Sequence, residues 1–504
     1  MELILLMAVL MLGGGAAWLT EAWDEALPRR VAMGTLAVAA VLTYMLWQGS
    51  DQSIALGTGT SDWRLLISHE WIPRFGISFL FGLDGISLIM VSLTIILGVV
   101  AVVSSWHEIE KATGFFHFNL LWTLAGVVGV FTALDLFLFF FFWEVMLIPM
   151  YLLIAIWGHE ARSYASMKFF LFTQISGLLM LVSIVALVFV NHEVTGVWTF
   201  SYFDLVETVL PPDIAYWLML GFFIAFVVKL PGFPFHTWLP DAHTQAPTAA
   251  SVLLAGILLK TGGYGLIRFT LPLFPEASQQ IAPLAMALGA AGILYGAVLA
   301  FAQVDFKRLV AYSSVSHMGF VLIGVYAWNE LALQGAMMQM IAHGFSTAAL
   351  FMIAGALQHR LHTRDMMAMG GLWRDMPRMG AIAMFFIIAS LGVPGLGNFV
   401  GEFLVLAGVF RVEITIAVIA TIGLVAGAAY ALIAMQRVFQ GPRPDNAAAV
   451  ADFGVLEVGV LFLMMVALTG IGIYPQPLLD VLEPVLASIY QLSNTDVAWI
   501  GRLP

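Results

Sequence analysis

Long apolar runs follow one another along nearly the whole chain, and short polar stretches separate them. A helix crosses the roughly 30 Å hydrocarbon core of a bilayer with about 20 mostly apolar residues. Runs of that length lie at 2–20, 31–48, 84–105, 114–132, 134–157, 168–190, 214–230, 247–270, 280–302, 308–327, 331–357, 380–410, 413–437 and 453–473. The pattern predicts an all-α polytopic membrane protein with about 14 transmembrane helices. Segment 64–83 and the tail after Pro475 have mixed polarity, and we expect them to be interfacial loops.

The composition agrees with a membrane protein and excludes a soluble one. Hydrophobic residues make up 61% of the chain and charged residues 10%, whereas soluble domains contain about 45–50% apolar and about 25% charged residues. No linker or low-complexity segment divides the chain, so we expect one membrane domain over residues 1–504. The first apolar run lacks a basic leader and a cleavage motif, which favours a retained helix over a signal peptide.

Basic residues are distributed unequally between the two sides of the predicted bundle. Thirteen of the 20 lysines and arginines, Lys307 among them, fall in loops after odd-numbered helices, and five, including Arg268, fall on the other side. The positive-inside rule places the first set in the cytoplasm. The two remaining basic residues, Lys229 and Lys260, lie within apolar runs or at their ends.

Two carboxylic acids share that unusual placement with the two lysines. Glu144 lies in the fifth run, and Glu402 follows an interruption in the twelfth. A charged side chain at the centre of a bilayer costs about 2.5–3.5 kcal/mol or more, so such residues usually pair or face a wet cavity. Desolvation brings buried lysines and carboxylic acids toward titration near neutral pH, as proton carriage requires. The alternative is a static salt bridge that joins two helices.

Polar residues elsewhere add candidates for a proton path. His317 and His343 lie in the tenth and eleventh runs, where a histidine can relay protons or serve as a hydrogen-bonded packing residue. Haem ligation by both histidines is a further alternative. His236, Asp241 and His243 lie in the segment HTWLPDAHTQAPT, which connects the seventh and eighth runs. These three residues could bind a metal, or line a proton entrance in an irregular segment; we favour the second interpretation.

Two runs are interrupted, and the interruptions suggest an internal repeat. Pro231 and Pro234 follow the seventh run, and Pro394 interrupts the twelfth. Paired breaks in two halves of a transporter indicate a transport site. Glu144 and His317 are separated by 173 residues, as are Lys229 and Glu402. An offset of five helices implies two inverted repeats, which we place at 114–270 and 280–437; the breaks fit less well, because Pro231 and Pro394 are 163 residues apart.

Several of these segments resemble a known family. They are FLFFFFWEVMLIPMY, FVVKLPGFPFHTWLPDAHTQAPTAASVLLAGILLKTGGYGLIRF, DFKRLVAYSSVSHMGFVLIG and PGLGNFVGEF. They are similar to the antiporter-like membrane subunits of proton-pumping NADH–quinone oxidoreductase, respiratory complex I, over nearly the whole chain. Within that family the resemblance favours the subunit M branch, counterpart of mitochondrial subunit 4, because many relatives carry lysine at the position of Glu402. The wider family includes multisubunit sodium/proton antiporter proteins and membrane hydrogenase subunits.

The resemblance implies a fold, roles and partners. The implied fold has 14 helices, two inverted five-helix repeats, and broken helices seven and twelve. Glu144 would modulate Lys229, Lys260 would lie on a central axis with His317 and His343, and Glu402 would be the exit-side acid. Flavin, iron–sulfur clusters and quinone would be held by partner subunits, including neighbouring antiporter-like subunits, in a bacterial inner membrane. The chain itself has no cysteine, so it cannot supply thiolate ligands to a cluster.

Three functions remain open from the sequence. The first is a proton-translocating subunit of NADH–quinone oxidoreductase, with no redox centre on this chain. The second is a subunit of a multisubunit cation/proton antiporter. The third is a structural membrane scaffold whose buried charges only hold helices together.

Overall fold

The computed structural model describes residues 1–49, 63–442 and 450–500 of the chain. Within these residues, 13 helices are long and apolar enough to cross a membrane. Twelve of them are single α-helices, at α1 (Glu2–Thr20), α2 (Leu27–Gln48), α3 (Gly85–Ser104), α4 (Thr113–Thr132), α5 (Leu136–Trp157), α6 (Arg162–Thr195), α8 (Pro212–Lys229), α13 (Pro275–Phe301), α14 (Phe306–Tyr326), α15 (Glu330–Leu361), α18 (Ile414–Val438) and α19 (Val455–Ile473). The thirteenth is the composite helix Thr248–Leu273.

A fourteenth crossing is made by two shorter apolar helices, α16 (Pro377–Ser390) and α17 (Gly397–Phe410). The expectation of about 14 crossings is therefore confirmed for the described residues. The break between α16 and α17 contains Gly392 and Gly395 at φ +67° and +93°, a region of backbone conformation that glycine adopts without steric cost. The twelfth helix is interrupted where the sequence predicted.

Helix seven is interrupted as well. Its first part, α8, ends at Lys229, and its second part is the short helix α9 (Trp238–Gln245). Pro231 and Pro234 lie in the gap, and proline cannot donate the backbone hydrogen bond that would continue a helix. The segment expected to be an irregular connection is therefore largely helical. The short helix α7 (Tyr202–Leu205) precedes α8.

The eighth helix is irregular inside, which the sequence analysis did not anticipate. It consists of α10 (Thr248–Leu253), a π-helical turn η3 (Leu254–Leu258), α11 (Leu259–Gly265), a second π-helical turn η4 (Leu266–Thr270) and α12 (Leu271–Leu273). All of its residues are buried. A π-helical turn shifts the hydrogen-bond register of a helix and often marks a functional site.

Two expectations about the ends of the bundle were wrong. Segment 64–83 is not a loop but an antiparallel hairpin of β1 (Leu65–Ile72) and β2 (Ile77–Leu83), joined by the 3-10 turn η2 (Pro73–Phe75). The tail after Pro475 forms the helix α20 (Gln476–Ile500), which contacts α3, α13 and α15. A further 3-10 turn, η5, spans Leu372–Arg374. The expected cytoplasmic Arg443 and the opposite-side Arg502 lie outside the described residues.

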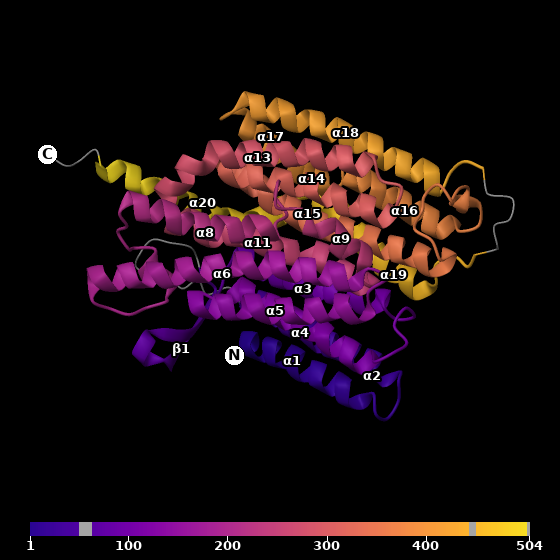
Figure 1. The fold of residues 1–504 in the computed structure, drawn as a ribbon, viewed down its shortest axis with the longest axis horizontal. Coiled ribbons are helices and arrows are strands. Elements are labelled where there is room, and N and C mark those ends of the chain that lie inside the picture. Colours follow the sequence, from indigo (N-terminus) through magenta and orange to yellow (C-terminus); the bar gives the residue numbers. More distant parts are fainter. Residues whose placement is uncertain (50–62, 443–449, 501–504) are drawn as a thin grey trace.

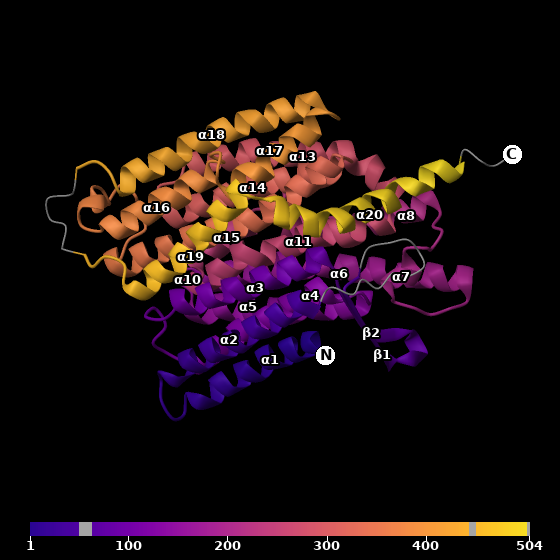
Figure 2. The same ribbon diagram turned by 180° about the vertical axis from the view of Figure 1, so that it is seen from behind.

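The helices form one bundle in which the chain advances from one edge to the other. Figure 1 shows α1 and α2 at one edge and α18 at the opposite edge, with α11 and α15 between them. The reverse view in Figure 2 shows α19 and α20 running across the outside of α15. The least exposed helices are the composite helix Thr248–Leu273, α14 and α15. These central helices carry Lys260, His317 and His343, half of the six candidate ionisable residues.

The starts of α5 and α14 share a local structure. Isolated antiparallel bridges join Asp135 to Ser201 and Asp305 to Asp365. Both Asp135 and Asp305 also cap the helix that follows them, since each accepts backbone N–H hydrogen bonds of 3.0 Å from its first turn. Five crossings separate the two starts, so the two bridges lie at opposite ends of the bundle.

Candidate functional site

The structure places five of the six candidate ionisable residues in the interior of the bundle. Lys229, Lys260, His317, His343 and Glu402 are each at most 5% exposed, and the sixth, Glu144, is half-buried. They come from six helices that lie in the order α5, α8, α11, α14 with α15, and α17. The sequence expectation of burial is confirmed, and the contacts among these residues divide them into two groups.

The first group is centred on Lys229, the last residue of α8. Its ammonium group has no hydrogen-bond partner among the residues that the structure describes. It lies 5.2 Å from the ring centroid of Trp143 and 5.6 Å from that of Phe169. The ammonium group is stabilised by the partial negative charge at the carboxyl end of α8 and by the faces of the two rings.

Glu144 lies near Lys229 but does not form an ion pair with it. The two residues interact electrostatically. No ion pair with an N–O distance of 4.0 Å or less joins them among the described residues. The side chain of Gln174 on α6 contacts the Glu144 carboxylate. This arrangement permits coupling between the two charges without locking them together, in contrast to the static salt bridge considered from the sequence.

The second group begins at Lys260, in the middle of the eighth helix. Its ammonium group donates to the carbonyl oxygen of Ala255 at 2.5 Å and lies 2.7 Å from Nδ1 of His343. Ala255 belongs to the π-helical turn η3. The wider turn therefore places a backbone acceptor beside the lysine, and His343 connects the eighth helix to α15.

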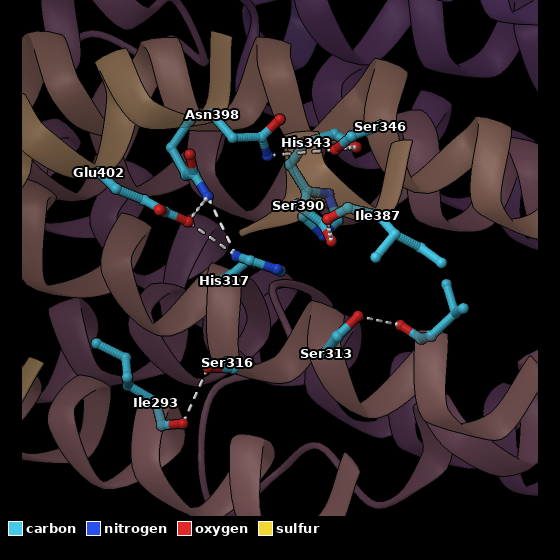
Figure 3. Close-up of polar contacts among 12 residues, drawn as sticks. Ile293, Ser313, Ser316, His317, His343, Ser346, Ile387, Ser390, Asn398 and Glu402 are labelled. Atoms are coloured by element: carbon cyan, nitrogen blue, oxygen red, sulfur yellow. Dashed lines mark hydrogen bonds and ion pairs between the residues drawn. The ribbon is translucent and has the colours of Figure 1, made fainter. Parts of the chain in front are cut away.

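His317 and Glu402 continue this group toward the opposite edge of the bundle. Nδ1 of His317 lies 3.0 Å from Oε1 of Glu402, and the rings of His317 and His343 have centroids 5.6 Å apart. Gln339 on α15 donates to the same Glu402 oxygen at 3.1 Å. Figure 3 shows His317 and Glu402 pointing toward each other across the gap between α14 and α17.

The break in helix twelve lies directly against this acid. A Cβ atom added to Gly392 would lie 2.3 Å from Oε2 of Glu402, and the φ of +67° also favours glycine there. On the far side, Asn398 donates to the hydroxyl of Ser346 at 3.2 Å (Figure 3). The unwound segment thus lies against the buried carboxylate, whose second oxygen, Oε2, has no hydrogen-bond partner among the described residues.

The structure does not bring His236, Asp241 and His243 together. His236 stacks on Phe233, and His243 stacks on Phe351 with ring centroids 4.2 Å apart. Asp241 accepts from Lys168 at 2.6 Å and lies 3.6 Å from Arg308. Three side chains that point to separate partners cannot form the metal site that their spacing allowed.

Sequence reasoning missed three residues that belong to these networks. Gln339 could have been found, because it lies four residues before His343 and therefore on the same face of a helix. Lys307, expected in an exposed loop, is fully buried and donates to the carbonyl oxygen of Ala246 at 2.6 Å. Arg268, also expected in a loop, is buried in η4 and forms an ion pair with Asp84. Loop assignments from the ends of apolar runs failed where a basic residue has a buried partner.

Comparison with known proteins identifies the class. Residues 133–427 match the family described as NADH:quinone oxidoreductase/Mrp antiporter, TM. The chain also resembles the Mrp complex from Dietzia, with 20% identity, a TM-score of 0.81 and 97% of each chain covered, a likeness that establishes the fold alone. The family model and the fold place this chain among the antiporter-like membrane proteins.

Closer relatives identify the branch. The NADH-quinone oxidoreductase subunit M of Pseudomonas aeruginosa is 53% identical over 497 residues, which cover 97% of this chain and 96% of that one. The Escherichia coli K12 protein of the same name is 53% identical, covering 95% and 96%. A chain of respiratory complex I from Thermus thermophilus is 31% identical with a TM-score of 0.88, covering 98% of this chain and all of that one. This chain belongs to the NADH-quinone oxidoreductase subunit M family, as its motifs predicted.

Proposed function

We propose that this chain is a proton-translocating membrane subunit of a bacterial NADH–quinone oxidoreductase. The observation that carries the proposal is the buried row formed by Lys260, His343, His317 and Glu402, in which each side chain contacts the next. The NADH and quinone chemistry, with its flavin and iron–sulfur clusters, takes place on partner subunits. This chain acts within that translocase and carries no redox centre.

In the proposed mechanism, Lys229 holds a proton that Glu144 controls. When Glu144 is ionised and close, its charge stabilises the ammonium form of Lys229; when that influence is removed, the desolvated lysine releases its proton. The lack of a direct ion pair keeps this exchange reversible. A pair locked at hydrogen-bond distance would hold the proton instead.

The proton then moves toward Lys260 and along the central row. Gly262, two residues after Lys260, packs tightly on the break in helix seven, since an added Cβ would lie 2.7 Å from the amide nitrogen of Leu230. A change in the protonation of Lys229 therefore occurs next to the eighth helix. Lys260 passes a proton to His343, which passes it to His317, and Glu402 is the exit-side acid. Each imidazole accepts a proton on one nitrogen and donates from the other.

The entrance to this path is lined by His236, Asp241 and His243 in our proposal. His236 lies in the break of helix seven, and Asp241 and His243 lie on α9 beyond it, toward the end of the bundle where most basic residues gather. The positive-inside rule assigns that end to the cytoplasm, and we take the membrane to be the bacterial inner membrane. Neighbouring antiporter-like subunits and other membrane subunits are the expected partners.

Two inverted repeats, at 114–270 and 280–437, remain our interpretation of the internal architecture. The matching bridges at Asp135 and Asp305, on opposite ends of the bundle, support it. The equal 173-residue spacing is a weaker argument, because Lys229 precedes the break in helix seven whereas Glu402 follows the break in helix twelve. The two residues therefore hold different places in their repeats.

The test is proton pumping by the purified complex in vesicles, driven by NADH. Lys229→Ala and Glu144→Ala should abolish the share of pumping carried by this chain while the complex stays assembled. Wild-type proton-to-electron stoichiometry in either variant would refute the assigned roles. Sodium-dependent transport by an assembly without NADH dehydrogenase activity would favour the antiporter alternative, and disassembly of the variants would favour the scaffold.

A further inference from the structure

Gln339 of α15 lies beside the last two members of the central row. Its side chain is fully buried. Its amide nitrogen Nε2 donates to Oε1 of Glu402 at 3.1 Å and lies 3.5 Å from Nδ1 of His317. The same Glu402 oxygen is 3.0 Å from Nδ1 of His317 (Figure 3). The three atoms form a closed triangle, although Gln339 has no role in the path proposed above.

Two glycines hold the backbone of Gln339 close to α17. A Cβ added to Gly401 would lie 2.5 Å from the amide nitrogen of Gln339 and 2.8 Å from its side-chain oxygen. On α15, a Cβ added to Gly335 would lie 2.5 Å from the amide nitrogen of Val405. Small residues allow helices in a membrane protein to approach closely. The packing therefore holds the Gln339 amide at the Glu402 carboxylate.

The hydrogen-bond partners of Glu402 assign the tautomer of His317. An ionised carboxylate only accepts hydrogen bonds, and the NH₂ group of an amide only donates them. Gln339 therefore turns its nitrogen toward Oε1 of Glu402. Nδ1 of His317 contacts the same oxygen, so in a neutral ring Nδ1 carries the hydrogen and Nε2 does not. The bare Nε2 of His317 is buried and has no partner among the described residues.

His343 has the opposite tautomer when Lys260 is protonated. The ammonium group only donates, and it lies 2.7 Å from Nδ1 of His343. Nδ1 is therefore an acceptor, and a neutral ring carries its hydrogen on Nε2, a buried atom without a partner in the part of the chain that the structure describes. The rings of His343 and His317 have centroids 5.6 Å apart. Along the row, a nitrogen that bears hydrogen is followed by a bare nitrogen of the next ring, reached directly or through one water.

We propose that Gln339 is a positioning residue that sets the direction of proton transfer along the row, from Lys260 toward Glu402. The inference rests on the proposed function. By donating to Oε1, Gln339 keeps this oxygen an acceptor, which holds the hydrogen of His317 on Nδ1 and leaves its Nε2 open to a proton from His343. When that proton binds Nε2, the N–H bond at Nδ1 breaks and an O–H bond forms on Glu402. No electron moves, and the row takes the next proton after Glu402 has released this one.

Loss of the Gln339 donor would remove this control. Oε1 of Glu402 would keep His317 as its one partner in the triangle, and the carboxyl group could turn or donate its own proton to Nδ1. His317 would then carry its hydrogen on Nε2. Two nitrogens that both bear hydrogen cannot form a hydrogen bond with each other, so transfer from His343 would stop.

Two variants of Gln339 test the proposal in the purified complex, by NADH-driven pumping in vesicles. Gln339→Met removes the donor and keeps the length of the side chain, so the proton-to-electron ratio should fall toward that of Glu402→Gln. Gln339→Glu has nearly the same shape and only accepts when ionised, so it should lower the ratio as well. The matched control is Gln334→Met, at a half-buried position five residues earlier on α15 and about 140° around the helix. The control should keep the wild-type ratio.

Infrared spectroscopy separates positioning from packing. The carboxyl band of Glu402 is the band that Glu402→Gln removes from the difference spectrum induced by NADH. Gln339→Met should move this band to higher wavenumber, because a hydrogen bond to a carboxyl oxygen weakens its C=O bond. Gln334→Met should leave the band in place. A residue that only packs α15 against α17 would lower the thermal stability of the complex without moving the band, and that result would overturn the proposal.

The outcomes separate this inference from the function on which it rests. Low pumping in Glu402→Gln with wild-type pumping in both Gln339 variants overturns the role of Gln339 alone. Wild-type pumping in both Glu402→Gln and Lys229→Ala overturns the proposed function. An equal loss of pumping in Gln334→Met and Gln339→Met would also overturn the inference, because the effect would then belong to α15 as a whole.

Discussion

His317 and Glu402 join two helices that are far apart in the sequence, with Nδ1 of the histidine 3.0 Å from Oε1 of the acid. Gln339 donates to the same oxygen and fixes its position. The other oxygen of Glu402 faces the unwound segment at Gly392. One carboxylate oxygen thus connects to the central row, while the second faces the break in helix twelve, an arrangement that supports the exit-side role proposed for this acid.

Replacing Glu402 by glutamine tests whether pumping needs the ability of this side chain to take up a proton or only its size. Glu402→Gln keeps an oxygen and the size of the side chain but cannot take up a proton, so we expect the proton-to-electron ratio of the complex to fall while NADH oxidation continues. The measurement is pumping in vesicles. Glu276→Gln, at an exposed position of α13, is the control, and equal pumping in both variants would contradict the role of Glu402.

Proton pumping should be equally sensitive to loss of the titratable amine of Lys260. Lys260→Met removes the group that contacts His343, and we expect loss of pumping with the complex still assembled. Lys260→Arg should not restore it, since arginine stays protonated and so cannot release a proton to the histidine. Restored pumping in the arginine variant would show that charge alone is needed there.

Gly262 tests how closely the eighth helix packs on the break in helix seven. An added Cβ would lie 2.5 Å from the carbonyl oxygen of Phe226 and 2.7 Å from the amide nitrogen of Leu230, and backbone atoms cannot move aside. Gly262→Ala should destabilise the subunit by about 1–3 kcal/mol. Gly34→Ala, in α2 with open space around it, is the matched control. The temperature at which the purified complex is inactivated should fall for the first variant only.

The buried ion pair of Asp84 and Arg268 should behave as a unit. Removing one partner leaves an unpaired buried charge, which costs about 3–5 kcal/mol. Arg268→Met should therefore lower the thermal stability of the complex strongly, and adding Asp84→Asn to it should recover part of the loss. Arg360→Met, which breaks the more exposed pair with Glu457, should cost much less. A double variant as unstable as the sum of its singles would contradict the pairing.

His159 lies in the loop between α5 and α6, and its lowered pKa predicts that the stability of the native state depends on pH. Burial, followed by the positive charges of Lys307 and Arg364, lowers the pKa of His159 to about 4. The unfolded chain binds this proton near pH 6.5, so the native state loses stability as the pH falls from about 6.5 toward 4. Replacing the residue by His159→Gln should make the acid-side decrease in Tm shallower. Parallel Tm curves for variant and wild type would contradict the lowered pKa.

The sequence alone settled the class of fold and the identity of the ionisable residues. Hydrophobic runs of membrane length give about 14 crossings, because the bilayer forces backbone groups to bond within each helix. Prolines predicted both breaks. Lysine, glutamate and histidine within apolar runs were conspicuous, since the bilayer tolerates few of them. Mixed polarity, by contrast, did not distinguish the β1–β2 hairpin or α20 from loops.

Only the tertiary structure decided which of these residues meet. The contacts of Lys260 with His343 and of His317 with Glu402 join helices separated by more than 80 residues, and no local pattern specifies such pairs. Burial of Lys307 was equally invisible, because a lysine beside a helix start looks exposed until its neighbours are placed. Sequence fixes which side chains can carry a proton, whereas packing sets the distances between them, and proton transfer depends on those distances.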